Sequence, residues 1–153
     1  MTIIFLDIDG VLRTHKSDLD NSILLNQEIP IRVYDRRFDL KAVSNINYIS
    51  YYVNTKIVVT STWRNNFTLE ELKQIFKDRG ITIEIIDKTD IGLTRGEEIR
   101  EWLDRNEVTN YVVIDDQVKD IVDWVDKDRI IHVNHFKGFT SDELVDKTLD
   151  ILL

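Results

Sequence analysis

The sequence of 153 residues contains no cysteine, only one proline and five glycines. The lack of cysteine excludes disulfides, cysteine-ligated zinc sites and thiol nucleophiles, and it fits a reducing compartment such as the cytoplasm. With so little proline and glycine there is no flexible linker, and the length predicts a single domain over residues 1–153. No segment approaches the ~18 consecutive apolar residues of a membrane span. We therefore expect a cytoplasmic protein without a membrane partner.

The sequence is also poor in positive charge, because it has 20 Lys and Arg residues against 28 Asp and Glu residues, a net charge of −8. This balance argues against extended nonspecific binding to nucleic acid, although it leaves room for a local basic edge. An acidic excess also suits a site that gathers carboxylates around a cation. The three histidines are isolated in the sequence and, without cysteine, do not predict a zinc site.

What the sequence does contain is an alternation of short apolar segments and amphipathic ones. The short segments are rich in β-branched residues and predict strands buried on both faces, at 2–6, 56–59, 81–86, 111–114 and 129–133. Helical spacing of apolar residues predicts helices at 40–53, 69–77, 97–105, 118–125 and 142–152. Thr68, Thr94 and Thr140 each precede a Glu by three residues, which is the pattern of a capping box. The alternation predicts a three-layer α/β/α Rossmann-like domain with a five-stranded parallel sheet.

Residues 13–39 interrupt this alternation. They show no clear periodicity and are far longer than the usual βα connection of about 2–6 residues. Because the segment follows the first strand, we expect an insertion over the carboxyl end of that strand, acting as a minimal cap or flap.

Polar residues follow the predicted strands where each one ends. Asp7 and Asp9 follow the first strand, Thr60 follows the second, and Asp115 and Asp116 follow the fourth. Ligands of open α/β sheets bind at the carboxyl ends of the strands. If the first and fourth strands are neighbours, their carboxylates converge there and repel one another unless a proton or a cation neutralises them. All-oxygen ligands suit Mg²⁺ better than Zn²⁺. The sequence therefore predicts a magnesium site at this edge.

The segment 3–12, a hydrophobic strand followed by Asp-x-Asp-Gly-Val, resembles the signature of the haloacid dehalogenase (HAD) superfamily. Three further segments follow in the order of the family's motifs: a strand ending in Thr60, a basic residue at Arg95, and the acidic pair Asp115–Asp116. The combination is similar to small members of phages and bacteria, some of which occur in nucleic-acid repair proteins. The resemblance implies a sheet with strand order 5-4-1-2-3.

The resemblance also implies roles for individual residues. Asp7 would be the nucleophile, Asp9 the general acid and base, and Thr60 and Arg95 the groups that bind the phosphoryl oxygens. The third motif more often carries Lys, so Lys88 is a rival to Arg95. The implied ligands of Mg²⁺ are Asp7, the main chain of Asp9, Asp115 and Asp116. The residues expected to contact the substrate are Gly10, Ser61, Trp63 and Arg64.

The function that follows from these roles is Mg²⁺-dependent hydrolysis of a phosphomonoester through an aspartyl-phosphate. The substrate would be a phosphorylated small molecule, such as a nucleotide, or a nucleic-acid end. Two alternatives remain open. One is a receiver-like phosphoacceptor, with Asp87 as the acceptor and Lys137 after the fifth strand. The other is a non-catalytic HAD-like module that only binds metal.

Overall fold

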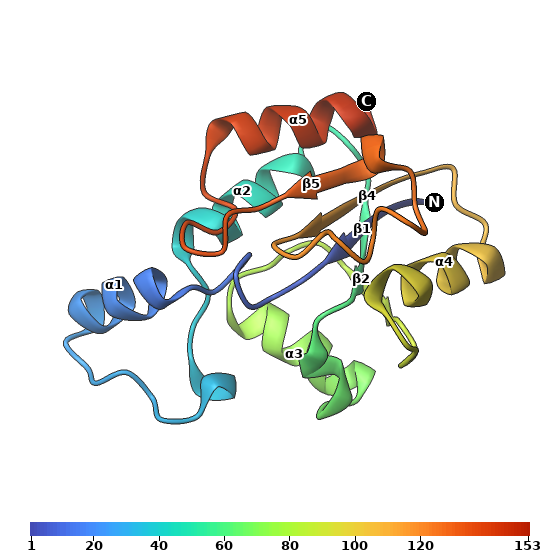
Figure 1. The fold of residues 1–153 in the computed structure, drawn as a ribbon. Coiled ribbons are helices and arrows are strands. Elements are labelled where there is room, and N and C mark those ends of the chain that lie inside the picture. Colours follow the sequence, from blue (N-terminus) through green and yellow to red (C-terminus); the bar gives the residue numbers. More distant parts are fainter.

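The computed structural model describes residues 1–153 and contains one five-stranded sheet at its centre (Figure 1). All strand pairs are parallel, and the spatial order is β3-β2-β1-β4-β5. This confirms the predicted strand order. The strands are β1 (Thr2–Leu6), β2 (Lys56–Val59), β3 (Ile85–Lys88), β4 (Asn110–Asp115) and β5 (Ile130–His132).

The strand order removes one of the alternative functions. Receiver domains have the order 2-1-3-4-5, in which the third strand pairs with the first. Here β1 pairs with β2 and β4, and β3 lies at the edge of the sheet. Asp87, the acceptor in that reading, lies in β3 and accepts a hydrogen bond from Trp102 Nε1 at 2.7 Å. The receiver-like alternative is therefore wrong.

Side-chain caps fix the beginnings of the helices. Thr68 and Thr94 cap the helices that follow them, as predicted, whereas the last helix is capped by Ser141, one residue later than the expected Thr140. In each case the hydroxyl accepts a hydrogen bond from a first-turn amide that has no partner within the helix. No helix is long and apolar enough to cross a membrane. The helices are α1 (His15–Leu25), α2 (Leu40–Ile49), α3 (Leu69–Asp78), α4 (Arg95–Arg105) and α5 (Asp142–Leu152).

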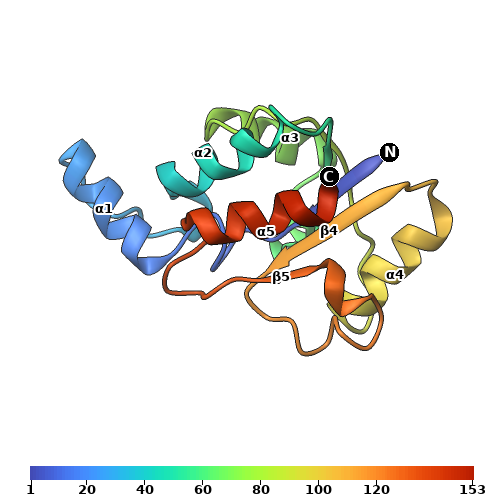
Figure 2. The same cartoon turned by 90° about the horizontal axis from the view of Figure 1, so that it is seen from above.

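Alternate strand residues point to opposite faces of the sheet and form two cores. Ile4 and Leu6 of β1 belong to the larger core, which also contains buried side chains of α2, α3 and α5. Ile3 and Phe5 belong to the smaller core with side chains of α4 and the segment after β4. Figure 2 shows α5 and α4 apart on the two sides of β4. The domain therefore has the three layers that the sequence predicts.

Residues 118–125 form hydrogen-bonded turns rather than the predicted helix. Only Ile121 and Val125 are buried in this segment, while Val122 and Trp124 are nearly half exposed. The segment lies so close to α4 that a methyl group on Gly96 would meet the backbone of Ile121 at 2.9 Å. The close packing holds the turns without a continuous helix. β3 also differs from the prediction, because residues 81–84 bury two isoleucines but precede the paired strand.

The segment 13–39 is more ordered than its sequence indicates, because it contains α1. Thr14 caps this helix in a capping box with Ser17, and Asn26 ends it in the left-handed conformation. The helix projects from the body in Figure 1 and leaves several large apolar side chains exposed. Its buried residues are Ser17 and Asp18 rather than an apolar stripe. Hydrophobic periodicity therefore could not reveal it.

Candidate active site

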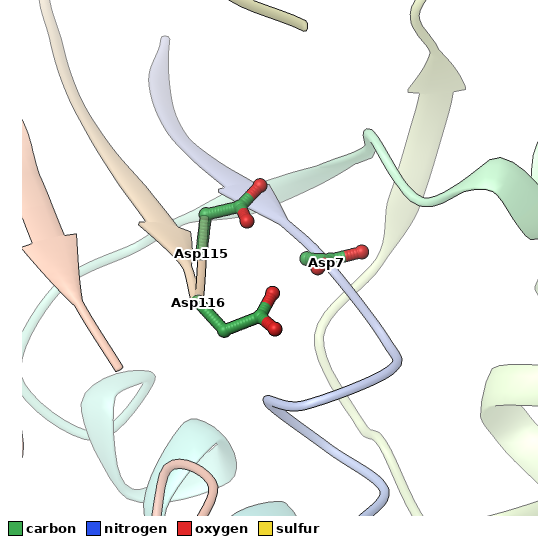
Figure 3. A group of neighbouring side chains, drawn as sticks. All are labelled: Asp7, Asp115 and Asp116. Carbon is green, nitrogen blue, oxygen red and sulfur yellow. The ribbon is translucent and has the colours of Figure 1, made fainter. Parts of the chain in front are cut away.

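Three carboxylates converge at the carboxyl edge of the central strands. Asp7 follows β1, and Asp115 is the last residue of β4. The register Leu6↔Ile114 therefore makes the two aspartates neighbours across the sheet. Asp116 follows directly, and each of the three offers an oxygen within 4.8 Å of the others. Figure 3 shows the three side chains facing a common space. Asp7 and Asp115 are almost fully buried, so their negative charges are poorly screened by water.

Arg95, the first residue of α4, is the cation that faces this cluster. Its Nη1 lies 2.8 Å from Asp115 Oδ2 and 3.2 Å from Asp7 Oδ2. Burial by itself would lower the pKa of Arg95, but the two carboxylates outweigh it and raise the pKa above its ordinary value. Burial raises the pKa of Asp7 well above its usual range, and the charge of Asp115 adds to this, although Arg95 opposes it. Burial likewise raises the pKa of Asp115.

The donor set of this cluster fits a divalent cation. One guanidinium faces three carboxylates, so negative charge remains when all three are ionised. All three donors are oxygens, which hard ions such as Mg²⁺ prefer. No amide or side chain of the protein donates a hydrogen bond to the carbonyl oxygen of Asp9, which is two residues from Asp7. The cluster is thus acidic, oxygen-rich and short of positive charge.

The carboxylate of Asp9 lies outside the cluster and faces the pocket. Its Oδ1 accepts a hydrogen bond from Arg13 Nε at 2.8 Å, and its Oδ2 accepts one from Trp63 Nε1 at 3.0 Å. The side chain remains 42% exposed, whereas the side chain of Asp7 is only 6% exposed in the wall of the pocket. Ile8 between them is fully buried in the larger core. The two aspartates therefore occupy different environments at one end of β1.

A polar pocket of about 320 Å³ opens over these residues. None of its lining residues is hydrophobic, which distinguishes it from the pockets that take apolar ligands. It contains three carboxylates and two guanidiniums, and this combination suits an anionic group brought in with a cation. The lining residues are Asp7, Asp9, Gly10, Arg13, Thr14, His15, Ser61, Thr62, Arg95, Asp116, Gln117 and His135.

Comparison with family models matches residues 3–144 to the HAD domain in Swiss Army Knife RNA repair proteins. The chain belongs to this HAD family. The match covers all five strands and every motif on which the resemblance in the sequence was based. Comparisons with curated proteins and with solved structures found no match.

The two basic residues considered for the third motif have different surroundings. Arg95 contacts Asp7 and Asp115, as described above. Lys88 instead donates hydrogen bonds of 3.0 Å to the carbonyl oxygens of Arg64 and Phe67. The ammonium of Lys88 is therefore used to hold the loop after β2, and Arg95 is the cation in the acidic cluster.

The residues after β2 reach the pocket only in part. Thr60 is fully buried, and its hydroxyl has no hydrogen-bond partner. The next residues, Ser61 and Thr62, line the pocket wall. Ser61 Oγ accepts a hydrogen bond from the amide of Trp63, which leaves its own proton available to a ligand.

Trp63 and Arg64, both expected to contact the substrate, are buried and have internal partners. Trp63 packs in the larger core and reaches the pocket only through its hydrogen bond to Asp9. Arg64 donates to the carbonyl oxygens of Thr60, Ser61 and Thr89 and pairs with the buried Glu98. A guanidinium occupied in this way organises the loop and is not presented to the pocket. The substrate contacts expected for Trp63 and Arg64 are therefore not seen, because both side chains bond to other parts of the protein instead.

The sequence did not single out Arg13 or His135 as a site residue, yet both line the pocket. Arg13 is 7% exposed and bridges Asp9 to the buried Asp18 of α1. The only local feature that could have indicated this contact is the spacing of four residues between Asp9 and Arg13. His135 follows β5, and only the tertiary fold brings it to the pocket. No pattern near it in the sequence could have indicated this position.

Gly10 allows the turn after β1 to approach the acidic cluster. Its φ of 81° lies in the left-handed region, and a methyl group there would come within 2.7 Å of the carboxyl carbon of Asp116. Gly10→Ala should therefore displace the Asp116 side chain and weaken Mg²⁺ binding by about 10-fold or more. Isothermal titration calorimetry with Mg²⁺ checks this expectation.

Gly80→Ala is the matched control for this substitution. Gly80 follows α3 with a φ of 91°, and its added methyl would meet only a side-chain carbon of Val43 at 3.3 Å. Both variants should lose about 1–2 kcal/mol of stability to backbone strain. Equal Mg²⁺ affinities in the two variants would show that Gly10 does not set the position of a metal ligand.

Proposed function

We propose that this protein is a Mg²⁺-dependent phosphatase that hydrolyses a phosphomonoester through an aspartyl-phosphate on Asp7. The proposal rests on one observation: two aspartates at the end of β1 lie in different environments. Asp7 is buried beside Arg95, and Asp9 is exposed at the pocket beside Arg13 and Trp63. Membership of the HAD family supports a hydrolase with this arrangement.

In the first half-reaction an oxygen of the Asp7 carboxylate attacks phosphorus and forms a P–O bond. The bond between phosphorus and the ester oxygen breaks, and its electron pair leaves with that oxygen. Asp9 donates a proton to the leaving oxygen, so the product departs as an alcohol. A carboxylate is a weak nucleophile, and its reactivity here depends on placement and on neutralised charge.

In the second half-reaction water attacks the phosphorus of the aspartyl-phosphate while Asp9 removes a proton from that water. The P–O bond to Asp7 breaks, which restores the carboxylate and releases inorganic phosphate. Arg95 offers positive charge to the phosphoryl oxygens in both halves. Ser61 lines the pocket and its hydroxyl can donate to the same oxygens, and the hydroxyl of Thr60, which has no partner in the protein, is a further candidate donor.

Mg²⁺ would be held by the carboxylates of Asp7, Asp115 and Asp116 and the main-chain oxygen of Asp9. When bound, it supplies the charge that offsets repulsion between Asp7 and an anionic phosphate. The raised pKa values of Asp7 and Asp115 support this assignment, because burial makes their ionised forms unfavourable and a bound cation would offset that cost.

The insertion at 13–39 acts in this proposal as a minimal cap that holds the general acid in place. Arg13 links Asp9 to Asp18 of α1, and Arg36 at the far end of the insertion pairs with the same Asp18 at 3.1 Å. Because the insertion contains only one α-helix and one short 3-10 turn, it leaves the pocket open to a bulky substrate. A phosphorylated nucleic-acid end fits such a site, and the family's occurrence in RNA repair proteins favours it over a free nucleotide.

Release of inorganic phosphate tests the proposal. We expect the protein, with Mg²⁺, to release phosphate from oligonucleotides that carry a 3′- or 5′-terminal phosphate, and to do so with higher kcat/KM than from mononucleotides. p-Nitrophenyl phosphate serves as the general phosphomonoester. An absence of phosphate release from all of these substrates would contradict the phosphatase and favour a module that binds metal without catalysis.

A further inference from the structure

An exposed aromatic side chain lies beside the pocket, on the loop 134–139 that follows β5. Phe136 is 65% exposed, although the next phenylalanine of the loop, Phe139, is fully buried in the larger core. Between β5 and Phe136 lies His135, whose side chain lines the pocket that contains Asp7 and Asp9. The catalytic machinery proposed above uses neither His135 nor Phe136.

The loop is held firmly in this shape. The side-chain oxygen of Asn134 accepts a hydrogen bond from the amide of Phe136 at 2.9 Å, and its carbonyl oxygen accepts bonds from the amides of Lys137 and Gly138. The amide of Phe139 donates to the carbonyl oxygen of Val11, which lies in the turn after β1. Hydrogen bonds therefore hold the loop that carries Phe136 and tie it to the turn after β1.

The two rings of this loop pack against each other, and Phe136 remains largely exposed. The ring centroids of His135 and Phe136 are 3.9 Å apart, with an interplanar angle of 38°. Other large apolar side chains are also exposed, such as Tyr51, but Tyr51 precedes β2 and so lies at the amino ends of the strands, opposite the pocket. The aromatic pair is distinguished by its continuity with the pocket through His135.

Cationic side chains lie near the pair in spite of the acidic chain. Arg13 and Arg95 line the same pocket, each paired with a carboxylate, and the ammonium of the exposed Lys137 takes part in no ion pair. A phosphorylated nucleotide presents a phosphate, a sugar and a planar base in one molecule. An aromatic surface next to a phosphate-binding pocket therefore offers each part of it a partner.

We propose that His135 and Phe136 form a stacking platform for the base of the phosphorylated terminal nucleotide. The proposal rests on the proposed function for the class of substrate, and it adds that the base itself is recognised by stacking. Stacking of a base on an aromatic side chain contributes about 1–3 kcal/mol and tolerates any base. The platform thus favours nucleotides over other phosphomonoesters without reading their sequence.

Binding of matched oligonucleotides tests the platform separately from catalysis. The probes are hexaribonucleotides with a terminal phosphate at one end, made either with an intact phosphorylated nucleotide or with the same nucleotide lacking its base. Dissociation constants are measured with Mg²⁺ in an Asp9→Asn background, which slows turnover. We expect the intact probe to bind about 10-fold more tightly than the abasic one.

Three substitutions at exposed aromatic positions decide the outcome. Phe136→Ala should reduce the preference for the intact probe to near one, Phe136→Trp should keep it, and Tyr51→Ala should leave it unchanged. Phe136 is exposed, so its removal leaves the core intact. A parent protein with no preference, or a preference that survives Phe136→Ala, would overturn the platform. If wild-type protein binds as expected but releases no phosphate, the proposed function fails and the platform stands.

Discussion

Asp7→Asn should lower the rate of phosphate release by about 10⁴-fold or more and, in the absence of metal, make the protein more stable. The loss of rate follows because an amide cannot form the aspartyl-phosphate. The gain in stability follows because Asp7 is a buried carboxylate beside Asp115, and an amide removes their repulsion. Arg95 keeps its shorter contact with Asp115 in the variant.

The gain in stability should depend on pH in a defined direction. Burial and Asp115 raise the pKa of Asp7 in the folded protein, so between its unfolded and folded pKa values the folded state binds more protons. The stability of the wild type then falls as the pH rises through this range. The advantage of Asp7→Asn should be absent below about pH 4 and complete above the raised pKa. Thermal denaturation in EDTA from pH 4 to pH 8 measures it.

Asp123→Asn is the matched control, because Asp123 is exposed and outside the pocket. It should change neither the rate nor the melting temperature. Equal rates of phosphate release from Asp7→Asn and Asp123→Asn would reject Asp7 as the nucleophile. A metal-free Asp7→Asn protein that is less stable than wild type at pH 7 would show that Asp7 is stabilised by its surroundings rather than strained by them.

Removal of Mg²⁺ should abolish phosphate release, and addition of Mg²⁺ should stabilise the fold. A ligand present at one hundred times its dissociation constant adds about 2.7 kcal/mol, which corresponds to a rise in melting temperature of roughly 5–10 °C for a domain of this size. The rise should be larger at pH 8 than at pH 5, because protons compete with the metal for carboxylates whose pKa values are raised. Activity and thermal denaturation, with EDTA and with excess Mg²⁺, measure both effects.

The Asp7→Asn and Asp123→Asn variants serve as controls for the predicted effect of Mg²⁺ on stability. Asp7→Asn should reduce the Mg²⁺-dependent rise in melting temperature, and Asp123→Asn should retain it. A rise of the same size in both variants would place the metal outside the cluster of Asp7, Asp115 and Asp116. Full activity in EDTA would contradict the metal requirement directly.

Local signals located most of the fold. The β-branched apolar segments marked the strands, and Thr68 and Thr94 marked the beginnings of α3 and α4, because capping depends only on residues within one turn. The same signals failed at 118–125, where apolar spacing indicated a helix but close packing against Gly96 holds turns instead. They also failed at α1, whose buried residues are polar.

The sequence by itself determined which residues end the strands, and hence that Asp7, Asp115 and Asp116 lie at the same edge of a parallel sheet, because parallel strands have their carboxyl ends at one edge. That these carboxylates meet depends on the pairing of β1 with β4, which the family resemblance implied and the tertiary structure shows. Only the tertiary structure decided that Arg95 and not Lys88 faces these acids, that Trp63 and Arg64 are internal, and that Arg13 and His135 reach the pocket. Those outcomes depend on contacts between segments far apart in the chain, for which no local pattern carries information.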